Sequence, residues 1–537
     1  MKPTTNQPQP VAAAPPPDAS APAALADGTP RAADRLLAIC DQYRYALLLA
    51  IFLLYILSFN AQWRISTDSA EHVIAAAHLV EPDSFALHQE PSRIEPGLSW
   101  LLAAEFSLLG IGSFSITTAL MFAMGLLGLA SAFVWVRVHL DRPNAVLVTT
   151  LLAVNFCYYQ YAYTIRPDLP FAVALLGFLA GYELFSKYDT RRIKILALVW
   201  MAAAIAIMTL FRSVAVLVLL ALGLALTWRV VAGPDRLKPA VVIVLAIVSI
   251  TIFRWADPRL DHPFQLNHSE IVFLQKLDNH RGELTRTIFH ENLPRLTSSS
   301  IPDAAFAVEF RYVLGDPLSL LIIAFVFALW LRRPLWVLIP VVFVSAQLLP
   351  FDPLTRYLLP VVPIIALAWW LGARWLNRQL PEPWAGRVFV AMILLWIIPN
   401  GIQVTRHIIQ QRSTPFIEHY KEGRYIALQQ LGQAIADKVE PHAMILTDGR
   451  TGEISWYARR HINDSFRYRD PDAWRSRFND TPLYFLGPPS DATREFIHEL
   501  DLQLDEPIIT IKDGRRPLTL HPTSPVDPER ASVSDEP

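Results

Sequence analysis

The feature that most constrains the fold of this chain is a series of long apolar runs joined by short polar connections. Each run is about 17 to 22 residues long, the length that an α-helix needs to cross roughly 30 Å of bilayer hydrocarbon. The runs start near Tyr45, Ser115, Ala145, Leu169, Ile195, Ser213, Ala240, Pro317, Leu335, Tyr357 and Val388. The 537 residues are 53% hydrophobic and only 18% charged, which excludes an ordinary soluble multidomain protein. The sequence therefore predicts a mainly α-helical, polytopic transmembrane helix bundle of about eleven spans.

The distribution of Lys and Arg between the connections predicts the orientation. With a cytoplasmic N-terminus, the inside connections carry fourteen Lys and Arg in total. These connections are 137–144, 186–194, 229–238, 332–334 and 374–387. The short outside connections carry one arginine each, Arg166, Arg212 and Arg356. Because positive residues concentrate on the cytoplasmic side, we expect a multi-pass protein of the cell inner (plasma) membrane with its C-terminal segment on the periplasmic or extracytoplasmic side.

The composition divides the chain into four regions. Residues 1–34 are rich in Pro and Ala and lack the pattern of a secretory signal, so they predict a disordered cytoplasmic tail. Residues 35–405 form the predicted transmembrane domain, with large outer loops at 61–114 and 256–316. Residues 406–521 predict a small outer α/β domain, and the polar, acidic residues 522–537 predict a disordered end.

The outer regions have recognisable elements of their own. In the first loop, 68–80 predicts an amphipathic helix along the membrane interface. The apolar stretch 101–112 is too short for a span and predicts a second interfacial helix, since counting it as a span would invert every later loop. The C-terminal region predicts a helix at 417–438, strands at 443–447 and 482–486, and a helix at 491–500.

Several classes of function are disfavoured by composition. The net charge of −1 and the lack of a basic run argue against a nucleic-acid partner. Cys40 and Cys157 fall near opposite faces of the predicted membrane domain, so we expect them to be unpaired packing residues. Four histidines crowd the second outer loop, but their spacing matches no zinc motif, which argues against a zinc site. They are His262, His268, His280 and His290.

Asp68 and Glu71 place two carboxylates just beyond the first span, in Ser66-Thr67-Asp68-Ser69-Ala70-Glu71-His72. Acids held at a bilayer surface suggest chemistry there. A structural explanation is equally open, because an acid at a helix N-cap followed three residues later by Glu is a variant of the capping box. Both hold together if the capping acid is also within reach of a substrate.

The three isolated outside arginines suggest a binding site for an anion. A single arginine at a span end is readily explained as an anchor to lipid headgroups. Three of them, in outside connections without lysine, favour a phosphate site, because guanidinium binds phosphate oxygens through a two-pronged set of hydrogen bonds. At a bilayer surface this phosphate is expected to belong to a lipid. Asp168 and Asp352 lie close by in their turns and are expected to orient the arginines by pairing with them.

The chain resembles the GT-C superfamily of polytopic glycosyltransferases, particularly the branch with lipid A aminoarabinose transferases and protein O-mannosyltransferases. The resemblance covers about residues 45 to 375 and rests on four features in order. They are Asp68, Glu95-Pro96-Gly97-Leu98-Ser99-Trp100, Arg166-Pro167-Asp168, and Arg356-Tyr357-Leu358-Leu359-Pro360-Val361-Val362-Pro363. The chain departs from the family where Asp68-Ser69 replaces Asp-Glu and Pro96-Gly97 replaces Pro-Pro. The C-terminal region matches no family motif.

The resemblance implies transfer of a hexosyl or pentosyl group from a polyprenyl-phosphate donor to a hydroxyl acceptor on the non-cytoplasmic face, with inversion. The acceptor is a lipid, a glycan or a protein. In this scheme Asp68 is the base and Glu71 the second catalytic acid. The substrate-binding residues are Arg93, Glu95, Arg166, Asp168, Arg212, Arg356 and Tyr357. No cofactor is certain, and a divalent metal, Mg or Mn, bridging Asp68 and Glu71 to phosphate is left open.

Other functions remain alternatives at this stage. A lipid-linked glycan polymerase or ligase would use the same acid and arginines. A transporter would bury ionisable groups at mid-membrane and often show related halves, whereas the span interiors here are nearly free of charge apart from Glu183. A membrane scaffold would need no phosphate site.

Overall fold

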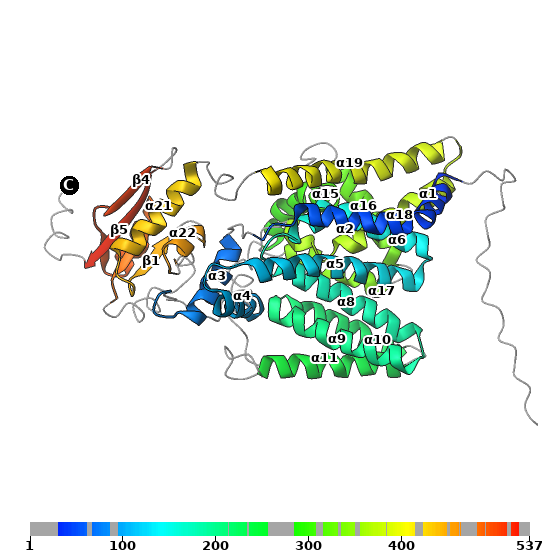
Figure 1. Cartoon of the computed structure of the whole chain (residues 1–537), viewed down its shortest axis with the longest axis horizontal. Helices are drawn as coiled ribbons and strands as arrows, with labels where there is room; N and C mark the ends of the chain where they lie inside the picture. The colour runs from blue at the N-terminus through cyan, green and yellow to red at the C-terminus, as the bar shows by residue number, and fades with distance from the viewer. Residues whose placement is uncertain are drawn as a thin grey trace, which may run out of the picture.

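The structure is a computed structural model of the whole chain. It describes residues 31–61, 67–85, 95–212, 214–232, 236–255, 284–307, 315–330, 334–348, 355–382, 384–413, 423–447, 452–460, 462, 481–488, 490–512 and 517–525. The helices gather into a bundle at one end of the molecule, and the C-terminal sheet lies at the other end (Figure 1).

A helix lies at or beside each predicted span start. The bundle helices are α1 (Ala32–Gln42), α2 (Arg44–Ser58), α5 (Ser115–His139), α6 (Arg142–Val154), α7 (Phe156–Tyr161), α8 (Asp168–Lys187), α9 (Arg191–Phe211), α10 (Ala215–Ala232), α11 (Leu237–Trp255), α16 (Gly315–Trp330), α17 (Pro334–Leu348), α18 (Val362–Gln379) and α19 (Trp384–Ser413). Of the helices described, α5, α8, α9 and α19 are individually long and apolar enough to cross a membrane, and α1 with α2 forms a pair bent by 77°. Apolar helices of this length mark an integral membrane protein. The count of about eleven spans stays a prediction.

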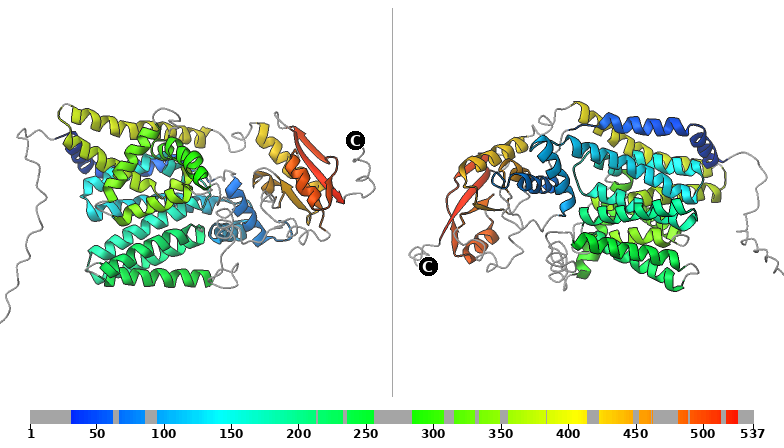
Figure 2. Two further views of the ribbon diagram at one scale, coloured as in Figure 1. Left: turned by 180° about the vertical axis from the view of Figure 1, so that it is seen from behind. Right: turned by 60° about the horizontal axis from the view of Figure 1, so that its bottom comes forward.

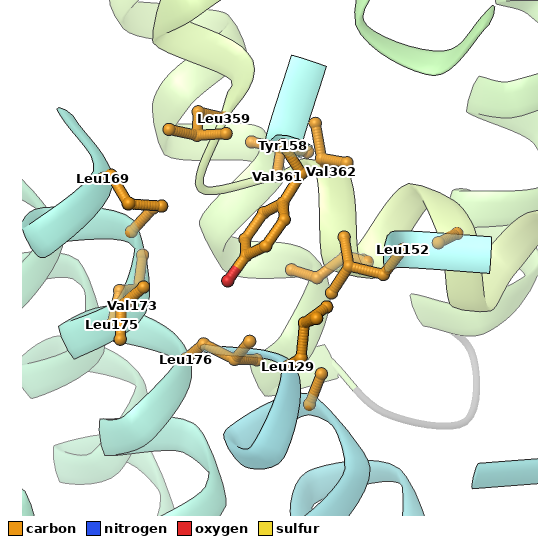
Figure 3. Packing of buried hydrophobic residues seen from close by; sticks show 14 of the residues in the cluster. Leu129, Leu152, Tyr158, Leu169, Val173, Leu175, Leu176, Leu359, Val361 and Val362 are labelled. Atoms are coloured by element: carbon orange, nitrogen blue, oxygen red, sulfur yellow. The ribbon is translucent and has the colours of Figure 1, made fainter. Parts of the chain in front are cut away.

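Helix α8 is the centre of the bundle. It packs against α5 and α9, and 83% of its apolar window is buried, compared with 28% for α9, which faces outward. Figure 3 shows the ring of Tyr158 among leucine and valine side chains from several helices. The Tyr158 hydroxyl donates to the carbonyl of Gly125 at 2.8 Å. The buried phenol therefore keeps a hydrogen-bond partner, as a polar group in an apolar core must.

The basic connections meet at one end of the bundle. Arg31 donates to the carbonyls of Asn377 and Arg378 at 2.7 Å, and Lys238 donates to the carbonyl of Ser186 at 3.0 Å. These contacts join connections that the sequence assigns to the cytoplasmic face. Which face this end occupies in a cell stays a prediction from the charge rule.

The predicted span that starts near Ala145 is broken at Asn155, between α6 and α7. The side chain of Asn155 accepts from the backbone of Tyr158 at 3.0 Å and so caps α7. Its amide donates to the carbonyl of Ala304 at 2.9 Å, in a helical segment that lies within the second outer loop. That segment comprises α13 (Leu284–Arg286), η2 (Thr287–Asn292), α14 (Leu293–Arg295), η3 (Leu296–Ser300) and α15 (Ile301–Phe306).

Helices α3 (Thr67–Val80) and α4 (Pro96–Leu109) lie between the bundle and the C-terminal domain (Figures 1 and 2). The helix predicted at 68–80 is present, and the second helix is longer than predicted because Pro96 begins it. Glu105 fixes the passage from α4 into α5, since its carboxylate accepts from the backbone of Ile116 at 2.7 Å and of Thr117 at 2.8 Å. This buried acid satisfies amides at the start of α5 that have no partner within the helix.

The C-terminal domain is a sheet with helices on both faces. Its strands are β1 (Met444–Thr447), β2 (Leu483–Leu486), β3 (Leu502–Leu504), β4 (Ile509–Lys512) and β5 (Pro517–Pro525), and its helices are α21 (Gly423–Lys438), α22 (Gly452–Tyr457) and α24 (Asp491–Glu499). The order is β1-β2-β5-β3, and β4 also pairs with β5; among the described strand pairs, β1 with β2 is parallel and the others are antiparallel. Alternate residues of β1 and β2 enter two apolar clusters, one shared with α21 and α22 and the other with α24.

Two predicted boundaries need correction. Strand β5 runs to Pro525, so the polar end predicted to begin at 522 contributes four residues to the sheet. Pairing with β2, β3 and β4 holds this segment, although its own sequence is only partly apolar. At the other end of the chain, α1 begins at Ala32, inside the tail predicted for 1–34.

Candidate functional site

Helix α3 carries the two predicted catalytic acids. It begins at Thr67, so Asp68 lies in its first turn and not at the N-cap. A carboxylate in the first turn still interacts favourably with the helix dipole. The Asp68 side chain lies outside the described residues. Because residues three and four apart share a helix face, the backbone puts Asp68 on the same side as Glu71 and His72.

The burial of α3 differs from the prediction of a helix with one exposed side. Residues 72–77 are all buried, and six consecutive residues cover every side of a helix. The reason is that α3 packs against α22 of the C-terminal domain as well as against α4. The domain that follows the last span therefore completes the surroundings of the predicted catalytic helix.

His72 is a residue of this site to which the sequence alone assigned no role. Its Nδ1 lies 3.2 Å from the hydroxyl of Ser99 on α4. Burial, and next the positive charge of Arg212, lower the pKa of His72 to about 3. His72 is therefore neutral near pH 7. Its spacing of four residues from Asp68 was the signal in the sequence that could have identified it.

Arg212 follows the last residue of α9 and forms an ion pair with Asp168, the first residue of α8. The expected pairing of Asp168 with an outside arginine is thus confirmed. The Asp168 side chain is 5% exposed, while that of Arg212 keeps 24% of its surface open. Burial acts to lower the pKa of Arg212, but Asp168, Tyr357 and Glu95 outweigh it and raise that pKa. The guanidinium is permanently charged.

A second arginine joins the first at the ring of Tyr357. Arg356 and Tyr357 lie in the 3-10 helix η4 (Thr355–Leu358). The guanidinium carbons of Arg212 and Arg356 lie 5.4 Å and 4.9 Å from the centre of the Tyr357 ring. Arg356 also donates to the Tyr357 hydroxyl at 3.1 Å. One aromatic ring therefore brings together two cations that are far apart in the sequence.

Gly97 explains how Glu95 comes near Arg212. A Cβ atom at Gly97 would lie 2.8 Å from the carbonyl oxygen of Leu210 and 3.0 Å from the ring of Phe211. Only glycine allows α4 to cross the end of α9 this closely, which gives a physical reason for Pro96-Gly97 in place of Pro-Pro. Glu95 is the N-cap residue of α4, its side chain does not cap that helix, and it is 8% exposed. Its carboxylate is one of the charges that raise the pKa of Arg212.

Of the remaining predicted residues, Arg166 is described by the structure and Arg93 is not. Arg166 makes a side-chain hydrogen bond with Tyr161, and Asp168 also acts electrostatically on that tyrosine. Arg166 thus shares the neighbourhood of Asp168. Arg93 and Asp352 lie outside the described residues, as do His262, His268 and His280.

Among the residues that the structure describes, no group of three His, Cys, Asp or Glu side chains is arranged to hold a metal ion. Both cysteines are buried and free. The acids of α3 nevertheless have the spacing at which two carboxylates share a helix face. Mg²⁺ or Mn²⁺ held by Asp68 and Glu71 would need water and the substrate phosphate to complete its oxygen shell.

The geometry combines permanent cations with buried acids and a neutral imidazole. Such an arrangement can hold a phosphate through Arg212 and Arg356, which donate through planar guanidinium groups. It also has acids at the start of α3 that can accept a proton.

The fold is similar to that of solved membrane proteins. No protein-family model matches the sequence, and no curated protein matches it. The structure is similar to ArnT from Cupriavidus metallidurans in the apo state, with a TM-score of 0.50 and 13% identity, over 90% of this chain and 98% of that one. It is also similar to the oligosaccharyltransferase of Archaeoglobus fulgidus in the apo form, with a TM-score of 0.52 and 12% identity, over 82% of this chain and 69% of that one.

The chain shares the fold of these two proteins, which are members of the GT-C superfamily. The resemblance indicated by the motifs around Asp68, Glu95, Arg166 and Arg356 is therefore confirmed at the level of the fold. At identities this low, the comparison establishes the GT-C fold and leaves the chemistry to be argued from the residues.

Proposed function

We propose that this protein is a membrane glycosyltransferase that moves a sugar from a polyprenyl-phosphate donor to a hydroxyl acceptor on the non-cytoplasmic face, with inversion. The observation that carries this proposal is the meeting of Arg212 and Arg356 at the ring of Tyr357, beside α3 and α4. Proteins with the GT-C fold include ArnT, a lipid A aminoarabinose transferase, and an oligosaccharyltransferase. These activities agree with the proposed class of reaction.

The arginines would stabilise the leaving group. As the bond between the anomeric carbon and the phosphate oxygen breaks, its electron pair leaves with the phosphate, whose negative charge increases. Fixed donors aimed at a developing charge lower the barrier because they need not reorganise during the reaction. Asp168 holds Arg212 in place through their ion pair. Arg356 is held by the hydroxyl of Tyr357.

The acceptor would be activated from α3. Its hydroxyl oxygen attacks the anomeric carbon from the side opposite the phosphate, so the configuration inverts, and the hydroxyl proton passes to the carboxylate of Asp68. His72, one turn further along, stays neutral and so adds no second positive charge beside the guanidinium of Arg212. Glu71 shares the face of Asp68 and would support it as a second acid.

The experiment that tests the proposal is transfer of a radiolabelled sugar by the purified protein from a panel of polyprenyl-phosphate hexoses and pentoses. We expect Asp68→Asn to lower turnover by about a hundredfold or more, the scale of a lost general base, while thermal stability is retained. Glu71→Gln should have a smaller effect. Asp83→Asn, an exposed acid in the turn after α3, is the matched control and should leave turnover unchanged.

The outcomes separate the competing functions. Near-normal turnover in Asp68→Asn removes that residue as the base. No transfer from any donor would rule out the glycosyltransferase and leave a transporter or a scaffold. Transfer only from lipid-linked oligosaccharides would make the protein a glycan polymerase or ligase that uses the same acid and arginines.

A further inference from the structure

A cavity of about 650 Å³ lies where the C-terminal domain meets the outer helices. It is separate from the arginine site. Its lining comes from the turn after α3, the turn after α4, and helices α21 and α22 with the turn that follows. The residues that matter here are Phe85, Gln433, Asp437, Trp456 and Arg459. The volume lies within the usual range for small-molecule sites, about 300 to 1,000 Å³.

Aromatic rings form one side of the cavity. Trp456 stacks on Phe85, with ring centres 5.9 Å apart and an angle of 25° between the planes. The same indole meets Phe114 edge to face at 6.3 Å. The backbone of Phe85 is held in place by α3, because its carbonyl oxygen lies 2.6 Å from Nδ1 of His78. Trp456 therefore has a rigid backing on the side of α3 and α5.

Polar groups from the C-terminal domain line the cavity as well. Gln433 and Asp437 are exposed and four residues apart, so they share one face of α21. Arg459 is exposed, and its φ of 51° is in the left-handed region that residues other than glycine rarely adopt. The next residue, Arg460, is buried and donates to the carbonyls of Val439 and Glu440. These bonds fix the turn that presents Arg459, and strained turns of this kind cluster at binding sites.

We propose that this cavity binds a saccharide. A sugar ring has a face of C–H groups that stacks on an aromatic ring and an edge of hydroxyls that both donate and accept hydrogen bonds. Trp456 supplies the ring, Asp437 accepts, Arg459 donates, and the amide of Gln433 does both. A purely apolar ligand would displace water from these charged groups without replacing its hydrogen bonds.

The position of the cavity indicates what kind of acceptor the protein uses. This step rests on the proposed function. Phe85 follows the C-terminal end of α3, whereas Asp68 lies in the first turn. A helix rises 1.5 Å per residue, so the two ends are about 18 Å apart. A sugar in the cavity is therefore not the one transferred at Asp68. The proposed occupant is a remote part of a glycan-bearing acceptor.

The test is saturation-transfer NMR on the full chain in detergent, without any donor. The probes are maltohexaose, mannohexaose and the hexamer of N-acetylglucosamine. We expect at least one probe to bind, and both Gln433→Ala and Asp437→Asn to weaken it by about tenfold, as for a lost hydrogen bond to a charged or polar group. Gln430→Ala, an exposed glutamine on α21 away from the cavity lining, should bind as the unaltered protein does.

Because Trp456 also holds the domain against α3, the decision rests on the two α21 variants, whose side chains are exposed. Failure of all three probes to bind the unaltered protein, or unchanged binding in both variants, overturns the proposal. The Asp68→Asn variant should bind the probes normally. Binding of a probe without any sugar transfer would refute the proposed function alone. Sugar transfer without binding of any probe would refute the cavity proposal alone.

Discussion

Removing the guanidinium of Arg212 should expose how much the site depends on its ion pair with Asp168. Breaking a buried pair costs about 3 to 5 kcal/mol, because the remaining charge has lost its partner. Asp168 is 5% exposed but Arg212 keeps 24% of its side-chain surface, so we expect the lower end, about 3 kcal/mol, for Arg212→Ala. Asp168→Asn keeps the shape and removes the buried charge, and should cost about 1 to 2 kcal/mol.

The double variant separates the pair from its surroundings. With both charges removed, no carboxylate is left buried, so Arg212→Ala with Asp168→Asn should be less destabilised than the sum of the single changes by about 1 kcal/mol or more. Unfolding by SDS titration from mixed micelles measures all four proteins under one condition. Additivity within about 0.5 kcal/mol would refute the idea that the two residues form a buried pair.

Measuring donor affinity then shows whether Arg212 binds the donor phosphate or only stabilises the fold. If Arg212 binds phosphate, the double variant should still bind a polyprenyl-phosphate donor more weakly by about 1.5 to 3 kcal/mol, although its fold is partly rescued. Arg356→Ala should show a similar loss, and Arg212→Lys should restore only part of it, because lysine lacks the planar fork. Normal donor affinity in the double variant would assign Arg212 a purely structural role.

Two further predictions concern pH and topology. His72 is neutral in the folded protein because burial, with Arg212, lowers its pKa to about 3. As the pH falls through 6.5 the unfolded chain binds a proton that the folded chain does not bind, so stability should fall with a slope that rises toward about 1.4 kcal/mol per pH unit. The mean slope between pH 6.5 and 5 should be smaller by about 1 kcal/mol per pH unit in His72→Gln, and parallel unfolding profiles would contradict the assignment. A cysteine at Ser490 should react with an impermeant reagent from outside, and one at Thr190 only after permeabilisation; labelling of position 190 in intact cells would reverse the predicted orientation.

The residues of the site were visible in the sequence, but their meeting was not. Asp168, Arg212 and Arg356 stood out as charges at the ends of apolar runs, and Glu95 stood out through the resemblance to a known family. That Tyr357 lies against both Arg212 and Arg356 depends on how α9 and η4 pack, which no local pattern encodes.

The same distinction applies to what the sequence missed. His72 meets Ser99, Gly97 meets Leu210, and Phe85 meets Trp456, and each pair joins segments that are distant along the chain. The Asp68 side chain itself lies outside the described residues, so its role stays a prediction from the sequence.

What the sequence determined by itself is the set of elements that local composition dictates. Apolar runs of membrane length give helices, because a backbone in an apolar surrounding must satisfy its own hydrogen bonds. Likewise β1 and β2 are short, fully buried and mostly apolar segments, and they were predicted almost to the residue. Strands β3, β4 and β5 were not, since their partly exposed residues become strands only through pairing with one another and with β2. The tertiary structure alone decided that the C-terminal domain covers α3, because that contact depends on surfaces brought together by the whole fold.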